Sequence, residues 1–148
     1  MEDSKVINQV LVRLFRRINA LEEKAICTGR FKNITLNELH VIEAIGTEGS
    51  RNMTAVAKDL EVTTGTLTTS VNSLVRKGLV ERVRSEDDRR VVLVSLTPMG
   101  LEAHEQHVIF HEKMVGEIIK ELDEEEVKVL SRGLDRLNGF FGSLDSVD

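Results

Sequence analysis

The 148-residue sequence contains no tryptophan, no tyrosine, one proline and one cysteine. Cys27 has no second thiol to pair with, so an internal disulfide is excluded and a reducing compartment is favoured. No apolar run approaches the roughly 18 residues that a membrane-spanning helix needs. The first ten residues are polar and charged and lack the apolar centre of a secretion signal. These absences predict a cytoplasmic protein that does not enter a membrane.

The patterns of common enzyme sites are missing too. The chain has no glycine-rich phosphate loop, no Gly-x-Ser-x-Gly turn and no spacing of paired carboxylates that indicates a catalytic cleft. Hydrophobic residues make up 41% and charged residues 30% of the sequence, which is typical of folded globular proteins. We therefore expect a folded protein that is not an enzyme and carries no cofactor.

The net charge is −5, but the charges are unevenly distributed. Residues 100–148 hold 12 acidic and 5 basic residues, whereas residues 1–32 hold 4 acidic and 7 basic ones. A further 6 basic residues lie within 76–90. A local basic surface can bind nucleic acid even where the whole chain is acidic, so the net charge does not exclude DNA as a partner.

Apolar residues recur at helical spacing through most of the chain. Thr35 and Glu38 form a capping box, and Asp123 with Glu126 forms another. Asn52 and Thr63 are candidate N-caps, and Thr97-Pro98 can begin a helix. The expected helices cover residues 5–26, 35–46, 52–60, 63–77, 98–121 and 123–142. Two short runs with strand patterns, 79–84 and 91–96, flank the polar loop SEDDRR and predict a hairpin. The element order is therefore ααααββαα.

The helix over 63–77 has two different faces. Its apolar residues, from Leu67 to Val75, form a stripe that we expect to be buried. The opposite face carries short polar side chains and no acid, and can therefore approach a major groove closely. Asn72 can pair there with adenine, and Gly65 lets the backbone come near a phosphate. Ser73 also belongs to this face, and the candidate DNA-contacting residues of the helix are Thr63, Gly65, Thr66, Thr68, Thr69, Asn72 and Arg76.

The predicted hairpin adds four arginines, Arg82, Arg84, Arg89 and Arg90. Asp88 lies two residues before Arg90 and can hold its guanidinium by a salt bridge. An arginine held at the tip of a hairpin can enter a minor groove, where the potential is most negative. The alternative is a solvated charged loop, since three acids share the loop. Together with the polar helix, the hairpin favours DNA binding.

The segment ERVRSEDDRRVVLVSLTPMG resembles the wing of the MarR family, with Asp88 and Arg90 in the wing and Leu96, Thr97 and Gly100 at the start of the next helix. LVRKGLVER resembles the exit from that family's recognition helix. The resemblance implies a mainly α fold with a small β-hairpin wing in one domain, 1–148. It also implies a winged helix-turn-helix lobe, 35–97, and a homodimer formed by helices within 5–32 and 98–143. The implied partner is a near-palindromic DNA operator.

Three segments, RFKNITLNELHVIEAIG, TTGTLTTSVNSLVRKG and VRSEDDRRVV, are similar to the fatty-acid-biosynthesis repressors of Gram-positive bacteria. That similarity implies a repressor whose operator affinity is raised by long-chain acyl-acyl carrier protein. Carrier proteins are acidic, which fits the basic residues of 1–32, although a solvated helix face explains these equally well. From the usual place of the ligand crevice, the effector-pocket candidates are Ile18, Leu21, Phe31, His40, Val41 and Phe110.

The histidines leave another interpretation open. His107 and His111 are four residues apart on one predicted helix, a spacing that can chelate a metal, and His40 could complete the site. Zinc-sensing members of the family use histidines in comparable places. We favour interface histidines and no metal, and we keep a zinc-responsive regulator, or a repressor released by another small ligand, as alternatives. A protein-interaction module that uses the helix-turn-helix only as a scaffold is a third possibility.

Overall fold

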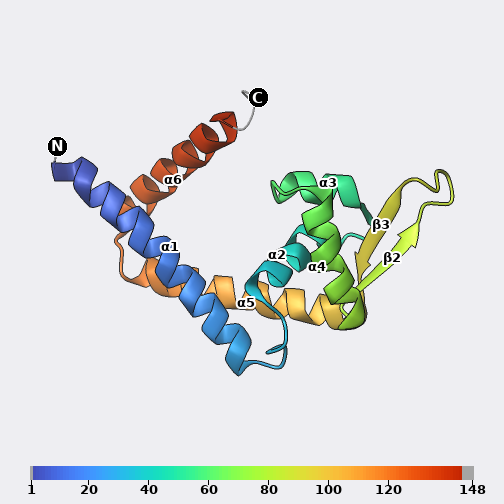
Figure 1. Ribbon diagram of the computed structural model, residues 1–148. Helices are drawn as coiled ribbons and strands as arrows, with labels where there is room; N and C mark the ends of the chain where they lie inside the picture. Colours follow the sequence, from blue (N-terminus) through green and yellow to red (C-terminus); the bar gives the residue numbers. More distant parts are fainter. Residues whose placement is uncertain (1, 145–148) are drawn as a thin grey trace. The chain divides into compact units, whose positions relative to one another are not determined.

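The computed structural model describes residues 2–144; Met1 and residues 145–148, which the predicted domain also includes, lie outside the described part. The chain divides into two compact units, with the boundary between Phe110 and His111. Figure 1 shows the helices and strands of the described residues. The helices are α1 (Glu2–Thr28), α2 (Leu36–Ile45), α3 (Met53–Asp59), α4 (Thr64–Arg76), α5 (Pro98–Lys120) and α6 (Glu124–Leu144).

The predicted caps of α2, α3, α4 and α6 are confirmed, whereas α1 is longer than the expected 5–26. Thr35 and Glu38 make the reciprocal bonds of a capping box, with both donor–acceptor distances at 3.1 Å. Asn52 accepts a hydrogen bond from the backbone of Thr54, and Thr63 accepts one from that of Thr66. A second capping box, between Asp123 and Glu126, begins α6. Each cap satisfies amides that have no partner inside the helix, so local sequence fixes where these helices begin.

The sheet has three antiparallel strands in the order β1-β3-β2. The predicted hairpin is present as β2 (Val80–Arg84) and β3 (Val92–Leu96). The expected element order is wrong in one respect, because β1 (Arg51–Asn52) pairs with β3 and opens the helix-turn-helix. A strand of two residues shows no periodicity in the sequence and forms only where its partner strand is in place.

The core of the first unit lies among α2, α3, α4 and the sheet. Ile42, Val56, Leu67 and Val94 are almost completely buried there. The expectation that Val75 is buried is wrong, since its side chain is 36% exposed. Val75 lies about 80° around the helix from Leu67 at 100° per residue, to one side of the stripe that packs on α2. The packed face of α4 is thus narrower than its apolar residues suggest.

A close junction joins the end of α4 to the start of α5. The hydroxyl of Thr97 donates to the carbonyl of Gly78 at 2.6 Å and accepts from the backbone of Gly100 at 3.1 Å. A Cβ on Gly100 would lie 2.0 Å from the carbonyl oxygen of Leu79, so only glycine fits at this position. The Leu-Thr-x-x-Gly pattern therefore sets how closely α5 packs against the segment between α4 and the wing.

The long terminal helices each present apolar side chains to solvent. On α1, Val6, Val10 and Leu14 are about half exposed, and on α6 the same holds for Leu134 and Phe140. No helix among residues 2–144 combines the length and apolar character needed to cross a bilayer. Exposed apolar surface on this scale is unusual in a monomer and typical of a protein–protein contact.

Candidate nucleic-acid interface

The outward face of α4 carries most of the predicted DNA-contacting residues. Gly65, Thr68, Thr69 and Arg76 are exposed, and Asn72 is half-buried. The hydroxyls of Thr68 and Thr69 donate back to the carbonyls of Thr64 and Gly65, so their methyl groups and acceptor oxygens remain available at the surface. This face holds no carboxylate. It therefore offers close approach without repelling a phosphate backbone.

Two more predicted contact residues also use their hydroxyls within the protein. Thr63 and Thr66 share a hydrogen bond of 2.9 Å, and Thr63 also caps α4. Ser73, which we expected on the outward face, instead donates to Glu38 of α2 at 2.6 Å. Ser73 precedes the buried Leu74 and is half-buried at the edge of the packed face, where the carboxylate of Glu38 reaches its hydroxyl. Ser73 is thus a packing contact of α4, and the expectation for it is wrong.

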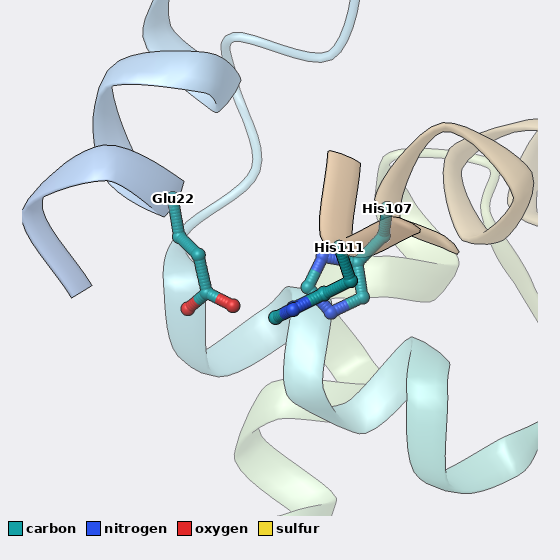
Figure 2. Close-up of side chains that lie close together, drawn as sticks. All are labelled: Glu22, His107 and His111. Atoms are coloured by element: carbon teal, nitrogen blue, oxygen red, sulfur yellow. The ribbon is translucent and has the colours of Figure 1, made fainter. Parts of the chain in front are cut away.

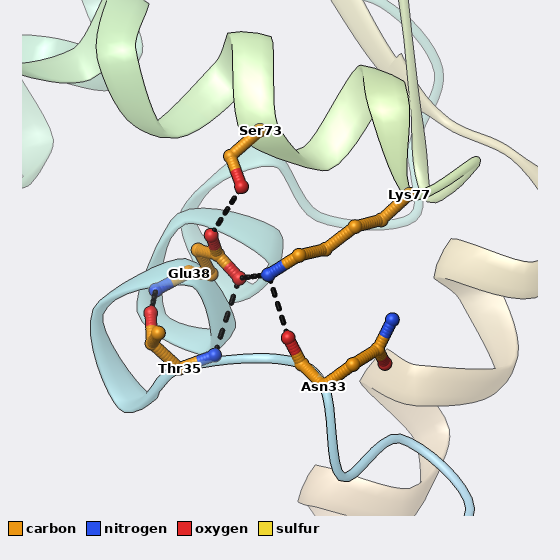
Figure 3. A network of polar contacts seen from close by, with 5 residues as sticks. All are labelled: Asn33, Thr35, Glu38, Ser73 and Lys77. Atoms are coloured by element: carbon orange, nitrogen blue, oxygen red, sulfur yellow. Dashed lines mark hydrogen bonds and ion pairs between the residues drawn. The ribbon is translucent and has the colours of Figure 1, made fainter.

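Glu38 is the centre of a polar network that the sequence does not reveal (Figure 3). Its carboxylate accepts hydrogen bonds from the Thr35 amide, the Ser73 hydroxyl and the Nζ of Lys77, the last at 2.7 Å. Lys77 also donates to the carbonyl of Asn33 at 2.6 Å. Burial raises the pKa of Glu38, but the hydrogen bonds from Lys77, Ser73 and Thr35 outweigh it and leave the pKa below its ordinary value. The network joins the start of α2 to the end of α4.

The wing places a held arginine beside α4. Asp88 accepts from the backbone, Nε and Nη2 of Arg90, all at 3.0–3.1 Å. These bonds from Arg90 lower the pKa of Asp88. Arg90 is 91% exposed, so its guanidinium is held in position while it remains accessible. The predicted salt bridge is confirmed, and a fixed guanidinium loses less entropy when it binds.

Arg82 connects the wing to α4. Its Nη1 donates to the side-chain oxygen of Asn72. Arg84 donates instead within the wing, to the carbonyl of Arg89 at 3.3 Å. A groove of about 700 Å³ lies between the starts of α3 and α4 and the wing, and it is lined by Thr54, Thr64, Thr68, Arg82, Arg84 and Arg90 among others. Thr54 and Thr64 line this groove but were not among the predicted contacts. Both lie in the first turn of a helix, and that position is the signal that could have found them, since N-terminal turns are suited to phosphates.

An apolar pocket of about 90 Å³ lies between α1, the loop after it, α2 and α5. Phe31 and Phe110, two of the effector candidates, line it together with Ile34, Leu39 and Ala103. His40 and Val41 instead line a separate cavity of about 200 Å³ beside α4. Of the remaining candidates on α1, Ile18 is half-buried and Leu21 is 50% exposed. Neither lines either of these two cavities.

Polar side chains at the edge of this pocket include the candidate metal ligands. Glu22 is 5% exposed, and its carboxylate lies 3.7 Å from Nε2 of His40. The ligand atoms of Glu22 and His107 lie within 4.8 Å of each other. Nε2 of His107 also lies 3.4 Å from Glu43. Figure 2 shows Glu22 on α1 with His107 and His111, which follow each other by one turn on α5. Imidazole and carboxylate are donors that zinc accepts.

The polar outward face of α4 and the arginine-bearing wing define a winged helix-turn-helix regulator. Comparison with known proteins agrees with this class. The chain is similar to a crystal structure of Streptococcus pneumoniae FabT in complex with DNA, with a TM-score of 0.92 and 43% identity, over 95% of this chain and 99% of that one. It is 31% identical to the HTH-type transcriptional regulator BilQ of Clostridium symbiosum, over 72% of this chain and 74% of that protein.

The family assignment follows from these matches. Residues 34–92 match the model of the MarR family. The chain is also 27% identical to the HTH-type transcriptional regulator YhjH of Bacillus subtilis, where the match spans 70% of this chain and 61% of that protein. The protein belongs to the MarR family of transcriptional regulators. The fold predicted from the sequence agrees with this family. The expectation that the protein is a DNA-binding regulator and not an enzyme agrees with it too.

Proposed function

We propose that the protein represses transcription by binding a near-palindromic operator as a homodimer. In this proposal α4 of each protomer enters a major groove and the wing arginines reach the flanking minor grooves, with half-sites about one helical turn apart. The observation that carries the proposal is the acid-free outward face of α4 beside Arg90, which Asp88 holds in an exposed position. Such a regulator acts where the chromosome lies, in the cytoplasm.

The second copy is the occupant that best fits the apolar terminal helices. Val6, Val10 and Leu14 form a stripe on α1 at spacings of three to four residues, and Leu130, Leu134 and Leu137 do so on α6. Two-fold pairing would bury identical stripes against each other, as is usual for closed dimers. It would also place two copies of α4 on one face of the duplex, which a palindromic site requires.

The proposed targets are fatty-acid-biosynthesis genes, and the proposed corepressor is long-chain acyl-acyl carrier protein. The similarity to FabT over nearly the whole chain supports this choice. An acidic carrier protein fits the basic residues of α1 and the following loop, such as Arg13, Arg17 and Lys32. The acyl chain would enter the apolar pocket between Phe31 and Phe110, which must widen because its volume is about 90 Å³.

The test is a titration of fluorescent duplex DNA from upstream of fatty-acid-synthesis genes, with and without palmitoyl-acyl carrier protein. We expect the dissociation constant to fall on the order of ten-fold when the acylated carrier is present, a change of about 1.4 kcal/mol. The unacylated carrier is the control. Equal effects of both carriers would remove the acyl chain from the proposal, and an increase in the dissociation constant would reverse the sign of regulation.

A zinc-responsive regulator is the second candidate, favoured by the buried carboxylate of Glu22 beside His40 and His107. Zinc would then raise operator affinity in the wild type, and His107→Ala would remove the response while leaving zinc-free binding in place. Cys27→Ser is the matched control, because that thiol is exposed on α1. If zinc does not change the operator affinity and no zinc stays bound after dialysis, the zinc-responsive function is eliminated.

A further inference from the structure

The contact between Asn72 and Arg82 determines which way the Asn72 amide faces. Arg82 is the central residue of β2, opposite Val94, and its Nη1 donates to Oδ1 of Asn72 on α4. A guanidinium has only N–H donors, so the amide must turn its oxygen toward the wing. The amide nitrogen then faces the other way, with both of its N–H groups free of that contact.

This orientation changes what Asn72 can recognise. A lone asparagine pairs with adenine by accepting from N6 and donating to N7. Here the accepting oxygen already receives the charged donor of Arg82, and a hydrogen bond to a charged group is stronger than one between neutral groups. The remaining N–H groups of Asn72 and Arg82 present donors alone. The Asn72 oxygen keeps a second lone pair, but the cationic guanidinium beside it favours a base edge made of acceptors over the N6 donor of adenine.

The base edges of the major groove differ in how well they match a pair of donors. Guanine shows two acceptors, O6 and N7, whereas adenine shows one acceptor and one donor. Thymine shows a single acceptor beside a methyl group, and cytosine shows a donor. Guanine is therefore the base whose edge fits donors supplied side by side by Asn72 and Arg82.

We propose that Asn72 and Arg82 act together as a guanine-reading pair in each operator half-site. Asn72 contacts the base, and Arg82 both orients the Asn72 amide and supplies a second donor. The proposal rests on the proposed function, since it requires α4 to lie in the major groove. It also assigns a role to the Arg82 side chain that differs from that of Arg90, which Asp88 holds within the wing.

The test is selection of duplexes from a randomised pool by the full-length protein and four variants. Wild type should select guanine at one position of each half-site, and Asn72→Ala should lose the preference at that same position. Arg82→Ala frees Oδ1 and should move the preference there toward adenine. Arg82→Lys keeps the charge, so it should alter the preference while leaving the salt dependence of affinity unchanged. Arg89→Ala is the control and should weaken binding equally for all bases.

A direct measurement follows on the selected duplex. Replacing that guanine with another base should weaken wild-type binding about 5- to 150-fold, the range of a bidentate base contact. Replacing it with 7-deazaguanine removes only N7 and should produce part of that loss. The same replacements should have little effect on Asn72→Ala. All these variants change exposed or half-buried side chains, and circular dichroism will confirm that each is folded.

The outcomes separate this inference from the function on which it rests. Selection of adenine at the Asn72-dependent position, or a guanine preference that persists in Arg82→Ala, overturns the guanine-reading pair. So does sequence-specific binding in which Asn72→Ala changes no position, because Asn72 would then contact only phosphate. A pool that shows no enrichment at all would instead contradict the proposed operator binding.

Discussion

Nζ of Lys77 lies 2.7 Å from Oε2 of Glu38, and this ion pair joins the last turn of α4 to the first turn of α2. Lys77 belongs to the basic cluster that suggests DNA binding in the sequence, yet its charge is used inside the protein. The Glu38 side chain is 9% exposed and that of Lys77 is 24% exposed, so neither can turn to water easily. The pair therefore positions α4 within the lobe.

Glu38→Gln should destabilise the protein. The variant keeps the shape of the side chain but leaves Lys77 without its counter-charge in a half-buried place, which should cost about 2 kcal/mol of unfolding free energy. Urea unfolding at a fixed protein concentration measures this. Asp59→Asn is the control, because it removes an ion pair with Arg51 whose side chains are 34% and 56% exposed; we expect it to cost less than about 1 kcal/mol. Equal losses of unfolding free energy in the two variants would show that the Glu38–Lys77 pair stabilises the fold no more than an exposed ion pair does.

The same carboxylate predicts a pH dependence. The pKa of Glu38 in the folded protein is lower than its ordinary value of 4.5. Its contribution to stability is therefore complete above that value and is lost as the pH falls through the lower, folded pKa. The difference in unfolding free energy between wild type and Glu38→Gln should be largest near pH 7 and should shrink in acid. A difference that stays constant down to pH 3 would contradict this assignment.

Gly100→Ala should be strongly destabilising. The added Cβ would lie 2.0 Å from the carbonyl oxygen of Leu79, and backbone on both sides must move to admit it. We expect a loss of about 3 kcal/mol or more, measured as a lowered melting temperature. Gly116→Ala on the same helix meets no atom within 4 Å and should instead gain roughly 0.5–1 kcal/mol from helix propensity. A mild effect of Gly100→Ala would mean that α5 can shift away from the wing.

Arg90→Ala should weaken operator binding for all sequences. Losing a phosphate or minor-groove contact should lower the salt slope of affinity by about one for each Arg90 in the complex. Asp88→Asn should have a smaller effect, because Arg90 keeps its charge and loses only the salt bridge that fixes its guanidinium. Lys120→Ala removes an equal charge outside the proposed interface and serves as the control. Arg90→Ala binding like wild type from low to high salt would exclude the wing from the interface.

Local sequence signals predicted much of the fold. The capping boxes at Thr35 and Asp123, and the salt bridge between Asp88 and Arg90, form between residues two or three apart, so they can be seen in the sequence. Their energetics depend little on the rest of the chain. This explains why helix starts and the wing could be placed without a structure.

Contacts between distant residues could not be predicted in this way. Ser73 meets Glu38 across 35 positions, and β1 exists only because β3 lies beside it. Arg82 and Asn72 were each predicted as DNA contacts, but their bond to each other depends on how the wing packs against α4. The apolar pocket draws its lining from α1, α2 and α5, which explains why only part of the effector set was gathered there.

The central claim is that the outward face of α4 binds DNA. Fluorescence anisotropy with a duplex selected by the protein, against a scrambled duplex of equal length, measures it directly when wild type is compared with Thr68→Glu. Thr68 is exposed in mid-helix, so the variant should fold normally and should lose specific binding by charge repulsion, while wild type prefers the selected duplex by about 10³-fold or more. Undiminished binding of the selected duplex by folded Thr68→Glu would contradict the account.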